Sequence, residues 1–60
     1  MLSFVVTFRE VESGEMLPIK IKAFGTLDAE RNAALELASR QERREVTGAW
    51  RTFSVSRCEP

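Results

Sequence analysis

Three residues near the end of the chain could act as nucleophiles: Ser54, Ser56 and Cys58. A hydroxyl or thiol nucleophile needs a neighbouring base to accept its proton, and the sequence contains no histidine. We therefore interpret these side chains as polar groups of a strand and not as catalytic residues.

Two pairs of carboxylates have the residue types needed for general acid and base catalysis: Glu10 with Glu12, and Glu42 with Glu45. The first pair belongs to an expected hairpin and the second to the solvated side of an expected helix, so surface charge is the better interpretation. The sequence has neither a phosphate-binding loop nor a metal-ligand spacing. It predicts no enzyme, no cofactor, no catalytic residue and no metal site.

The composition indicates one small soluble domain. The 60 residues are 43% hydrophobic and 30% charged, with nine basic and nine acidic side chains. This balance argues against a membrane span and gives no overall positive field for nucleic acid. A single cysteine excludes an intramolecular disulfide and the first residues lack a basic signal-peptide start, so we expect a cytoplasmic protein. Because so short a chain buries little surface, we expect a monomer or a weak homodimer.

The longest periodic segment, TLDAERNAALELASRQERREV, begins at Thr26, is rich in Ala, Leu, Glu and Arg, and contains no proline or glycine. It predicts a helix over about residues 27–46, with the Thr26 hydroxyl as the N-cap and Gly48 beyond the C-terminus. The side predicted to face a sheet consists of Leu27, Ala34, Leu37, Ala38 and Gln41, flanked by Ala33 and Leu35. Because this side is rich in alanine, the large core side chains must come from strands.

Three segments alternate between apolar and polar residues and predict strands at about residues 2–11, 16–24 and 50–58. The first two are separated by a short break that contains Gly14, which predicts a hairpin. The residues predicted to face the helix are Leu2, Phe4, Val6 and Phe8, then Leu17, Ile19, Ile21 and Ala23, then Phe53 and Val55.

These elements predict an α+β domain of ββαβ order, in which one helix covers one face of a three-stranded antiparallel or mixed sheet. Pro18 cannot donate a backbone hydrogen bond, which favours an edge position for the second strand. With a right-handed crossover, the third strand returns beside the first and antiparallel to it. The predicted sheet order is therefore 2-1-3, in a single two-layer domain over residues 1–60.

One helix leaves the other face of the sheet open, and basic and aromatic residues are expected there. The expected members at this face or its rim are Val5, Arg9, Lys20, Lys22, Phe24 and Trp50. Such a mixture is typical of a surface that docks a protein or stacks nucleic-acid bases. Trp50 has an equally good alternative place, in which it folds around the end of the sheet and closes the core.

The densest charge cluster runs from Arg40 to Glu45. Mixed signs three and four residues apart are typical of a solvated helix face whose charges pair with one another. The second interpretation is a basic helix end that recognises acidic groups, because Arg40, Arg43 and Arg44 fall within one turn.

The segments FVVTF, LPIKIKA, TLDAE, AALELA and FSVSRCEP resemble the small RNA polymerase inhibitor of T7-like phages. The similarity covers most of the chain if about one helical turn is inserted between TLD and ALELA. It implies a ββαβ protein made early in infection that binds the jaw of the host polymerase. In that family, arginines at the end of the last strand are central to the contact. Arg57 matches the first of them, whereas Glu59 stands at the position of the second.

The sequence leaves three functional hypotheses open. The first is a phage-type interaction protein that binds and inhibits a host machine without chemistry of its own, with bacterial RNA polymerase as the first candidate. The second is a small nucleic-acid-binding module that uses the open sheet face, and the third is an antitoxin-like dimerising domain. The candidate partner-binding residues are Trp50, Arg51 and Arg57 in the last strand, Lys20 and Lys22 in the second, and Arg40, Arg43 and Arg44 in the helix.

Overall fold

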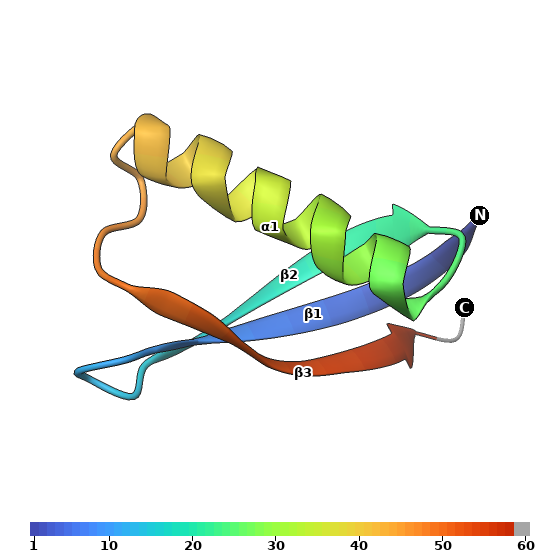
Figure 1. The fold of residues 1–60 in the computed structure, drawn as a ribbon, viewed down its shortest axis with the longest axis horizontal. Coiled ribbons are helices and arrows are strands. Elements are labelled where there is room, and N and C mark those ends of the chain that lie inside the picture. Colours follow the sequence, from blue (N-terminus) through green and yellow to red (C-terminus); the bar gives the residue numbers. More distant parts are fainter. Residues whose placement is uncertain (59–60) are drawn as a thin grey trace.

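The computed structural model describes residues 1–58 and follows the order ββαβ. Strand β1 spans Leu2–Glu10, β2 spans Met16–Ala23, α1 spans Thr26–Glu42 and β3 spans Trp50–Cys58. The sheet order is β2-β1-β3, and β1 is antiparallel to both neighbours. Helix α1 lies across one face of the sheet and leaves the other face uncovered (Figure 1). The predicted α+β domain with the order 2-1-3 is confirmed.

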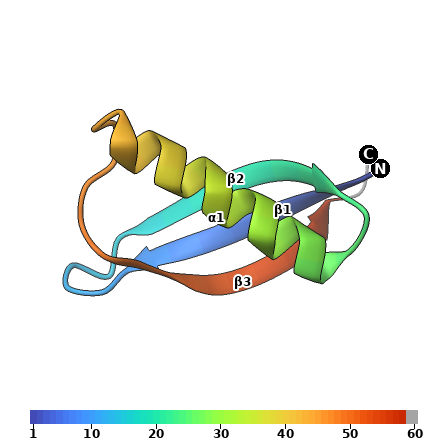
Figure 2. The same cartoon turned by 45° about the horizontal axis from the view of Figure 1, so that its top comes forward.

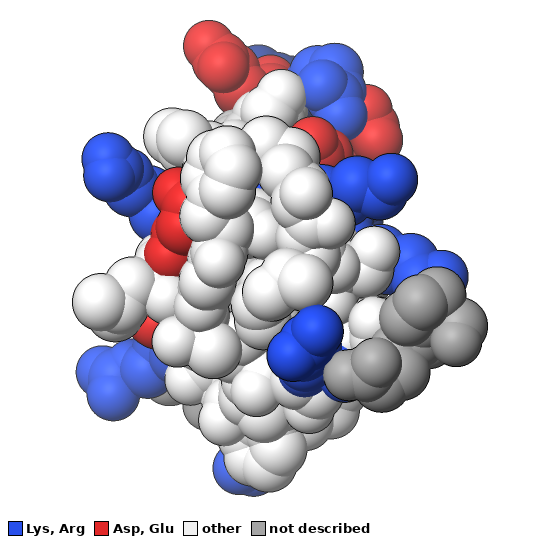
Figure 3. All heavy atoms as spheres, turned by 90° about the vertical axis from the view of Figure 1, so that its right-hand side faces the viewer, with Lys and Arg blue, Asp and Glu red and all other residues white. Residues whose placement is uncertain are grey.

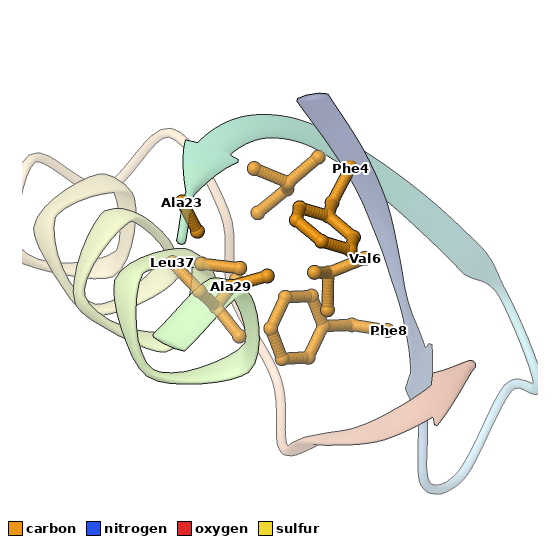
Figure 4. Close-up of a cluster of buried hydrophobic side chains, with 8 residues drawn as sticks. Phe4, Val6, Phe8, Ala23, Ala29 and Leu37 are labelled. Atoms are coloured by element: carbon orange, nitrogen blue, oxygen red, sulfur yellow. The ribbon is translucent and has the colours of Figure 1, made fainter. Parts of the chain in front are cut away.

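The core lies between α1 and the sheet. Every second residue of β1 points toward the helix, and Figure 4 shows the rings of Phe4 and Phe8 with Val6 between them directed at Ala29 and Leu37. The buried apolar residues are Phe4, Val6, Phe8, Ile19, Ala23, Ala29, Ala33 and Leu37, and the partly buried ones around them are Leu17, Ile21, Val46, Trp50 and Val55. Because two of the three buried helix residues are alanine, the bulk of the core comes from β1 and β2, as predicted.

The side of α1 that faces the sheet differs from the predicted one. The buried residues of the helix are Ala29, Ala33 and Leu37, one every fourth position. The residues that were predicted to face inward but are exposed are Leu27, Ala34, Ala38 and Gln41, and Leu35 is exposed as well. Apolar residues occur all around this helix, so their spacing does not single out one side. The side with Ala29 and Ala33 faces the sheet because its small side chains let the helix approach the aromatic rings of β1 closely.

The N-terminus of α1 is capped differently from the prediction. The N-cap residue is Gly25, with extended backbone and no side-chain cap, so Thr26 does not serve this role. Instead, the carboxylate of Asp28 reaches back and accepts a hydrogen bond of 3.1 Å from the backbone N–H of Phe24. Asp28 therefore fixes the turn between β2 and α1, and its negative charge lies at the positive end of the helix.

The C-terminus of α1 comes four residues earlier than predicted, at Glu42. Arg44 has a left-handed backbone with φ of 61°. Its N–H donates to the carbonyl of Gln41 at 3.0 Å, and the N–H of Glu45 donates to that of Arg40 at 2.9 Å. This pair of hydrogen bonds is a Schellman motif, which ends a helix and satisfies its last carbonyls.

Strand β3 contains a β-bulge that alters the alternation predicted for it. The consecutive β1 residues Thr7 and Phe8 pair with Ser54 and Thr52, so Phe53 is an extra residue with no partner on β1. Helix α1 runs diagonally and lies mainly over β2, which leaves β3 at the margin of the covered area (Figure 2). Phe53 is 58% exposed, and its prediction as a core residue is wrong.

Candidate binding face

Among residues 1–58, the open face of the sheet carries four cations and no carboxylate. The cations are Arg9 in β1, Lys20 and Lys22 in β2, and Arg51 in β3, all of them exposed. Glu10 is the only acidic residue within the three strands, and by alternation it points to the opposite side. The chain as a whole has no net charge, but the open face of its sheet is positively charged.

At one end of this face, two arginines occupy directly opposite strand positions. Arg9 and Arg51 are direct cross-strand partners, and neither forms an ion pair within residues 1–58. Like charges directly opposite each other destabilise a sheet. The two arginines line an open depression together with Glu10, Val11, Thr52 and Phe53. An exposed aromatic ring beside two unpaired cations can stack on a planar group and attract an anion.

The bulge is what brings Arg51 to the open face. In a regular ladder continuing from Thr7 and Ser54, Arg9 would pair with Thr52 and Arg51 would point toward the helix. The extra residue Phe53 shifts the register by one position, so Arg51 meets Arg9 instead. Neither this pairing nor the exposure of Phe53 follows from strict alternation in the sequence.

The other two cations occupy the opposite end of the face, on β2. Lys20 pairs with Val5 and Lys22 pairs with Ser3. Ser3, Lys20 and Lys22 line a second shallow depression together with Ile21. The residues between the two cationic ends are small or neutral, and the potential nucleophiles Ser54, Ser56 and Cys58 lie among them. The face is therefore basic at two corners and uncharged between them.

Trp50 does not lie on the open face. Its cross-strand partner is Glu10, on the helix side of the sheet, and its ring packs against the core. The indole N–H donates a hydrogen bond of 3.0 Å to the carbonyl of Thr47. Of the two places predicted for Trp50, closure of the core is the one observed.

Phe24 lies just outside the strands, because β2 ends at Ala23 and Phe24 belongs to the turn that leads into α1. Figure 3 shows the end of the molecule that carries this turn and the N-terminus, where uncharged side chains fill most of the middle and charged side chains of both signs lie beside and around them. Met1, Phe24 and Leu27 are 76%, 76% and 83% exposed. This end therefore exposes apolar side chains outside the strands of the basic face.

The candidate arginines of α1 pair mainly with nearby groups of their own segment. Arg40 forms an ion pair of 2.9 Å with Glu36, and Arg43 forms one with Glu45 and a hydrogen bond of 2.8 Å to Ser39. The hydrogen bond between Arg43 and Glu45 raises the pKa of the guanidinium and lowers the pKa of the carboxyl. This arrangement fits the solvated, self-paired helix face better than a basic recognition surface.

Arg44 and Arg57 lie apart from the four cations of the open face. Arg44 is exposed in the turn that ends α1. Arg57 is exposed near the end of β3, where its partner Phe4 places it on the helix side of the sheet. Glu59, which takes the place of the second family arginine, lies outside the described residues.

Glu10 is held in the structure by backbone hydrogen bonds from two separate loops. One carboxylate oxygen accepts from the N–H groups of Glu12 and Ser13, at 3.0 and 2.8 Å, and the other accepts from Ala49 at 3.1 Å. The side chain is 9% exposed. These bonds, that from Ser13 foremost, lower the pKa of Glu10 below its usual value of 4.5. Glu10 is thus a structural tie between the hairpin turn and the loop before β3, and the interpretation as surface charge is wrong.

Gly48 is fitted closely to this tie. Its φ of 104° is a conformation that residues with a side chain rarely adopt. A Cβ atom at this position would lie 3.0 Å from Oε2 of Glu10 and 3.2 Å from its Cδ. Gly48 therefore serves the carboxylate tie and not the end of the helix, for which it was predicted.

We expect Glu10→Gln to lower stability at neutral pH and to flatten its dependence on acid. In the native state the pKa of Glu10 is depressed, so its stabilising effect is present above the unfolded-state value and is lost as pH falls through the lower folded value. The glutamine amide keeps one acceptor oxygen, but its NH₂ group replaces the second oxygen. That NH₂ group is a donor and cannot accept the hydrogen bond of a backbone N–H. Urea unfolding at about pH 7 and about pH 3 measures both effects.

Glu12→Gln provides the matched control, because the Glu12 side chain is exposed and only its backbone N–H joins the network. Its urea unfolding should match that of the parent at both pH values. Equal stability and equal acid sensitivity of Glu10→Gln and the parent would show that the tie contributes nothing to folding.

Residues 1–58 contain no group of three or more His, Cys, Asp and Glu side chains placed to hold a metal ion. The same part of the chain has no helix with the length and apolar character needed to cross a membrane. Comparison of the whole chain with protein-family models, with curated proteins and with solved structures finds no match.

Proposed function

We propose that this chain is a small non-catalytic binding protein that inhibits a host macromolecular machine in the cytoplasm, and that the open sheet face makes the contact. Bacterial RNA polymerase is the first candidate target. The observation that carries the proposal is the cross-strand pair of Arg9 and Arg51 on a face whose described residues include no carboxylate. Carboxylates on the surface of a partner would attract both arginines and so offset the repulsion between them.

The choice of RNA polymerase rests on the resemblance to the phage inhibitors. The observed element order is the ββαβ plan that the resemblance implies. Arg57 occupies the position of a contact arginine in that family. The basic face supplies a second surface, on the other side of the sheet, for an acidic region of the same target.

The test is capture of partners from a bacterial lysate on the immobilised chain, followed by titration with purified RNA polymerase and a promoter-dependent transcription assay. We expect saturable binding and inhibition of transcription. If another complex is retained and RNA polymerase is not, the polymerase assignment fails while the binding function stands. If the chain retains no partner and inhibits no transcription, the proposal is wrong.

Single-stranded nucleic acid is the second candidate partner, and Phe53 is the observation that favours it. Its exposed ring lines the same depression as Arg9 and Arg51, so a base could stack while the phosphates meet the guanidinium groups. Titration with labelled single-stranded RNA and DNA at two salt concentrations tests this. Binding that weakens steeply with salt supports it.

We expect Arg57→Ala to leave folding intact and to weaken target binding by about 2 kcal/mol or more if a partner carboxylate engages the guanidinium through two hydrogen bonds. Arg57→Lys should recover only part of the affinity, because lysine keeps the charge and loses the bidentate geometry. Calorimetric titration against the captured target, with thermal melts of each variant, measures this. Unchanged affinity in folded Arg57→Ala would place the contact on the open face alone.

A further inference from the structure

The outer side of α1 carries a stripe of four exposed residues that is complementary to itself. Its members are Arg31, Leu35, Ala38 and Glu42, at spacings of four, three and four residues. That spacing brings side chains onto one line along a helix and is the spacing of a helix-pairing seam. The stripe lies opposite the buried alanine side, and Figure 1 shows no element covering it.

The stripe has an apolar middle and charged ends of opposite sign. Leu35 is 66% exposed, and Ala38 lies beside it one turn further along. Arg31 at one end and Glu42 at the other form no ion pair within residues 1–58, whereas Arg40 and Arg43 nearby are both paired. Leu35 is therefore exposed to water between two charges that form no ion pair with any described residue of their own chain.

An antiparallel second copy satisfies all four positions at once. When two such helices pack with a twofold axis midway along the stripe, Arg31 of each copy meets Glu42 of the other. In the same register, Leu35 of each copy meets Ala38 of the other. A parallel pair would instead place Arg31 against Arg31 and Glu42 against Glu42, which is repulsive.

We propose that this chain forms a homodimer through the outer stripe of α1, with the two helices antiparallel. The alternative of pairing through the edge of the sheet is disfavoured, because β2 carries Pro18, Lys20 and Lys22 and β3 carries the bulge at Phe53. The helix-paired dimer leaves both basic faces exposed on opposite sides. It is independent of what those faces bind.

Sedimentation equilibrium of the full chain over a wide concentration range, with charge-reversed variants, tests the proposal. Arg31→Glu and Glu42→Arg each place two like-charged contacts in the dimer, so we expect each to raise the dimer dissociation constant about tenfold or more. An equimolar mixture of the two variants should recover dimerisation as a heterodimer, because every contact then joins opposite charges. The double variant should recover a homodimer for the same reason.

Glu12→Arg is the control, since it makes the same charge change as Glu42→Arg at an exposed position of the hairpin turn. It should dimerise like the parent, and thermal melts should show that all variants fold. A parent chain that stays monomeric at every concentration would overturn the proposal. So would a dimer that is insensitive to both reversals, which would point to the sheet edge, or a mixture that fails to recover association.

Discussion

Phe8→Ala should lower the free energy of unfolding by about 3 to 5 kcal/mol, and Phe4→Ala should do the same. Both rings are almost completely buried between β1 and α1, at 3% and 2% exposure. The helix facing them offers mainly alanine, which cannot move in to fill the space that a truncated ring leaves. For a domain of 60 residues, this loss approaches the whole stability. Urea unfolding followed by circular dichroism measures it.

Phe53→Ala is the control that the bulge provides. It removes the same atoms from the same sheet, but its ring is 58% exposed, so we expect a change within about 0.5 kcal/mol. A large loss for Phe53→Ala together with a small loss for Phe8→Ala would mean that the faces of the strands are reversed.

Arg51→Glu should change stability and binding in opposite directions. A glutamate opposite Arg9 replaces a like-charge pair with an ion pair, so we expect a gain of about 0.2 to 1 kcal/mol in folding. The same change places a negative charge on the basic face and should weaken binding of an acidic partner by about 2 kcal/mol or more. Thermal melts and titration against the captured partner give the two quantities separately.

Arg44→Glu makes the same charge change at the end of α1, away from the sheet face. We expect it to leave affinity within about twofold of the parent. If Arg44→Glu loses affinity and Arg51→Glu does not, the contact lies at the helix end. If Arg51→Glu is more stable than the parent and binds the partner with full affinity, the open face does not make the contact.

The order of elements and the sheet topology could be predicted because β1 and β2 alternate without interruption. One face of each strand is almost wholly apolar, so the register that buries it is fixed, and Pro18 marks β2 as an edge. The rotation of α1 could not be predicted in the same way. Leucine and alanine occur on every side of this helix, and the choice among them depends on how closely its axis approaches Phe4 and Phe8.

The basic face could be predicted only in part. Lys20, Lys22 and Arg9 follow from alternation, and the structure places them where the pattern indicates. The meeting of Arg9 with Arg51 depends on a bulge, and a bulge changes register without a signature in the sequence of β3. The tie made by Glu10 was not predicted either, because its donors are backbone N–H groups, and the fold brings one of them, that of Ala49, from a distant loop.

The central position of β1 has a consequence for synthesis. This strand leaves the ribosome before β2 and β3. One of its two edges is hydrogen-bonded to β3, so Ser3 cannot pair until its partner Cys58 has been synthesised. Until β3 emerges from the exit tunnel, the nascent ββα segment presents an unpaired strand edge beside two aromatic rings. The sheet can therefore be completed only once β3 is available, and a chaperone that binds exposed strands would meet the chain in that interval.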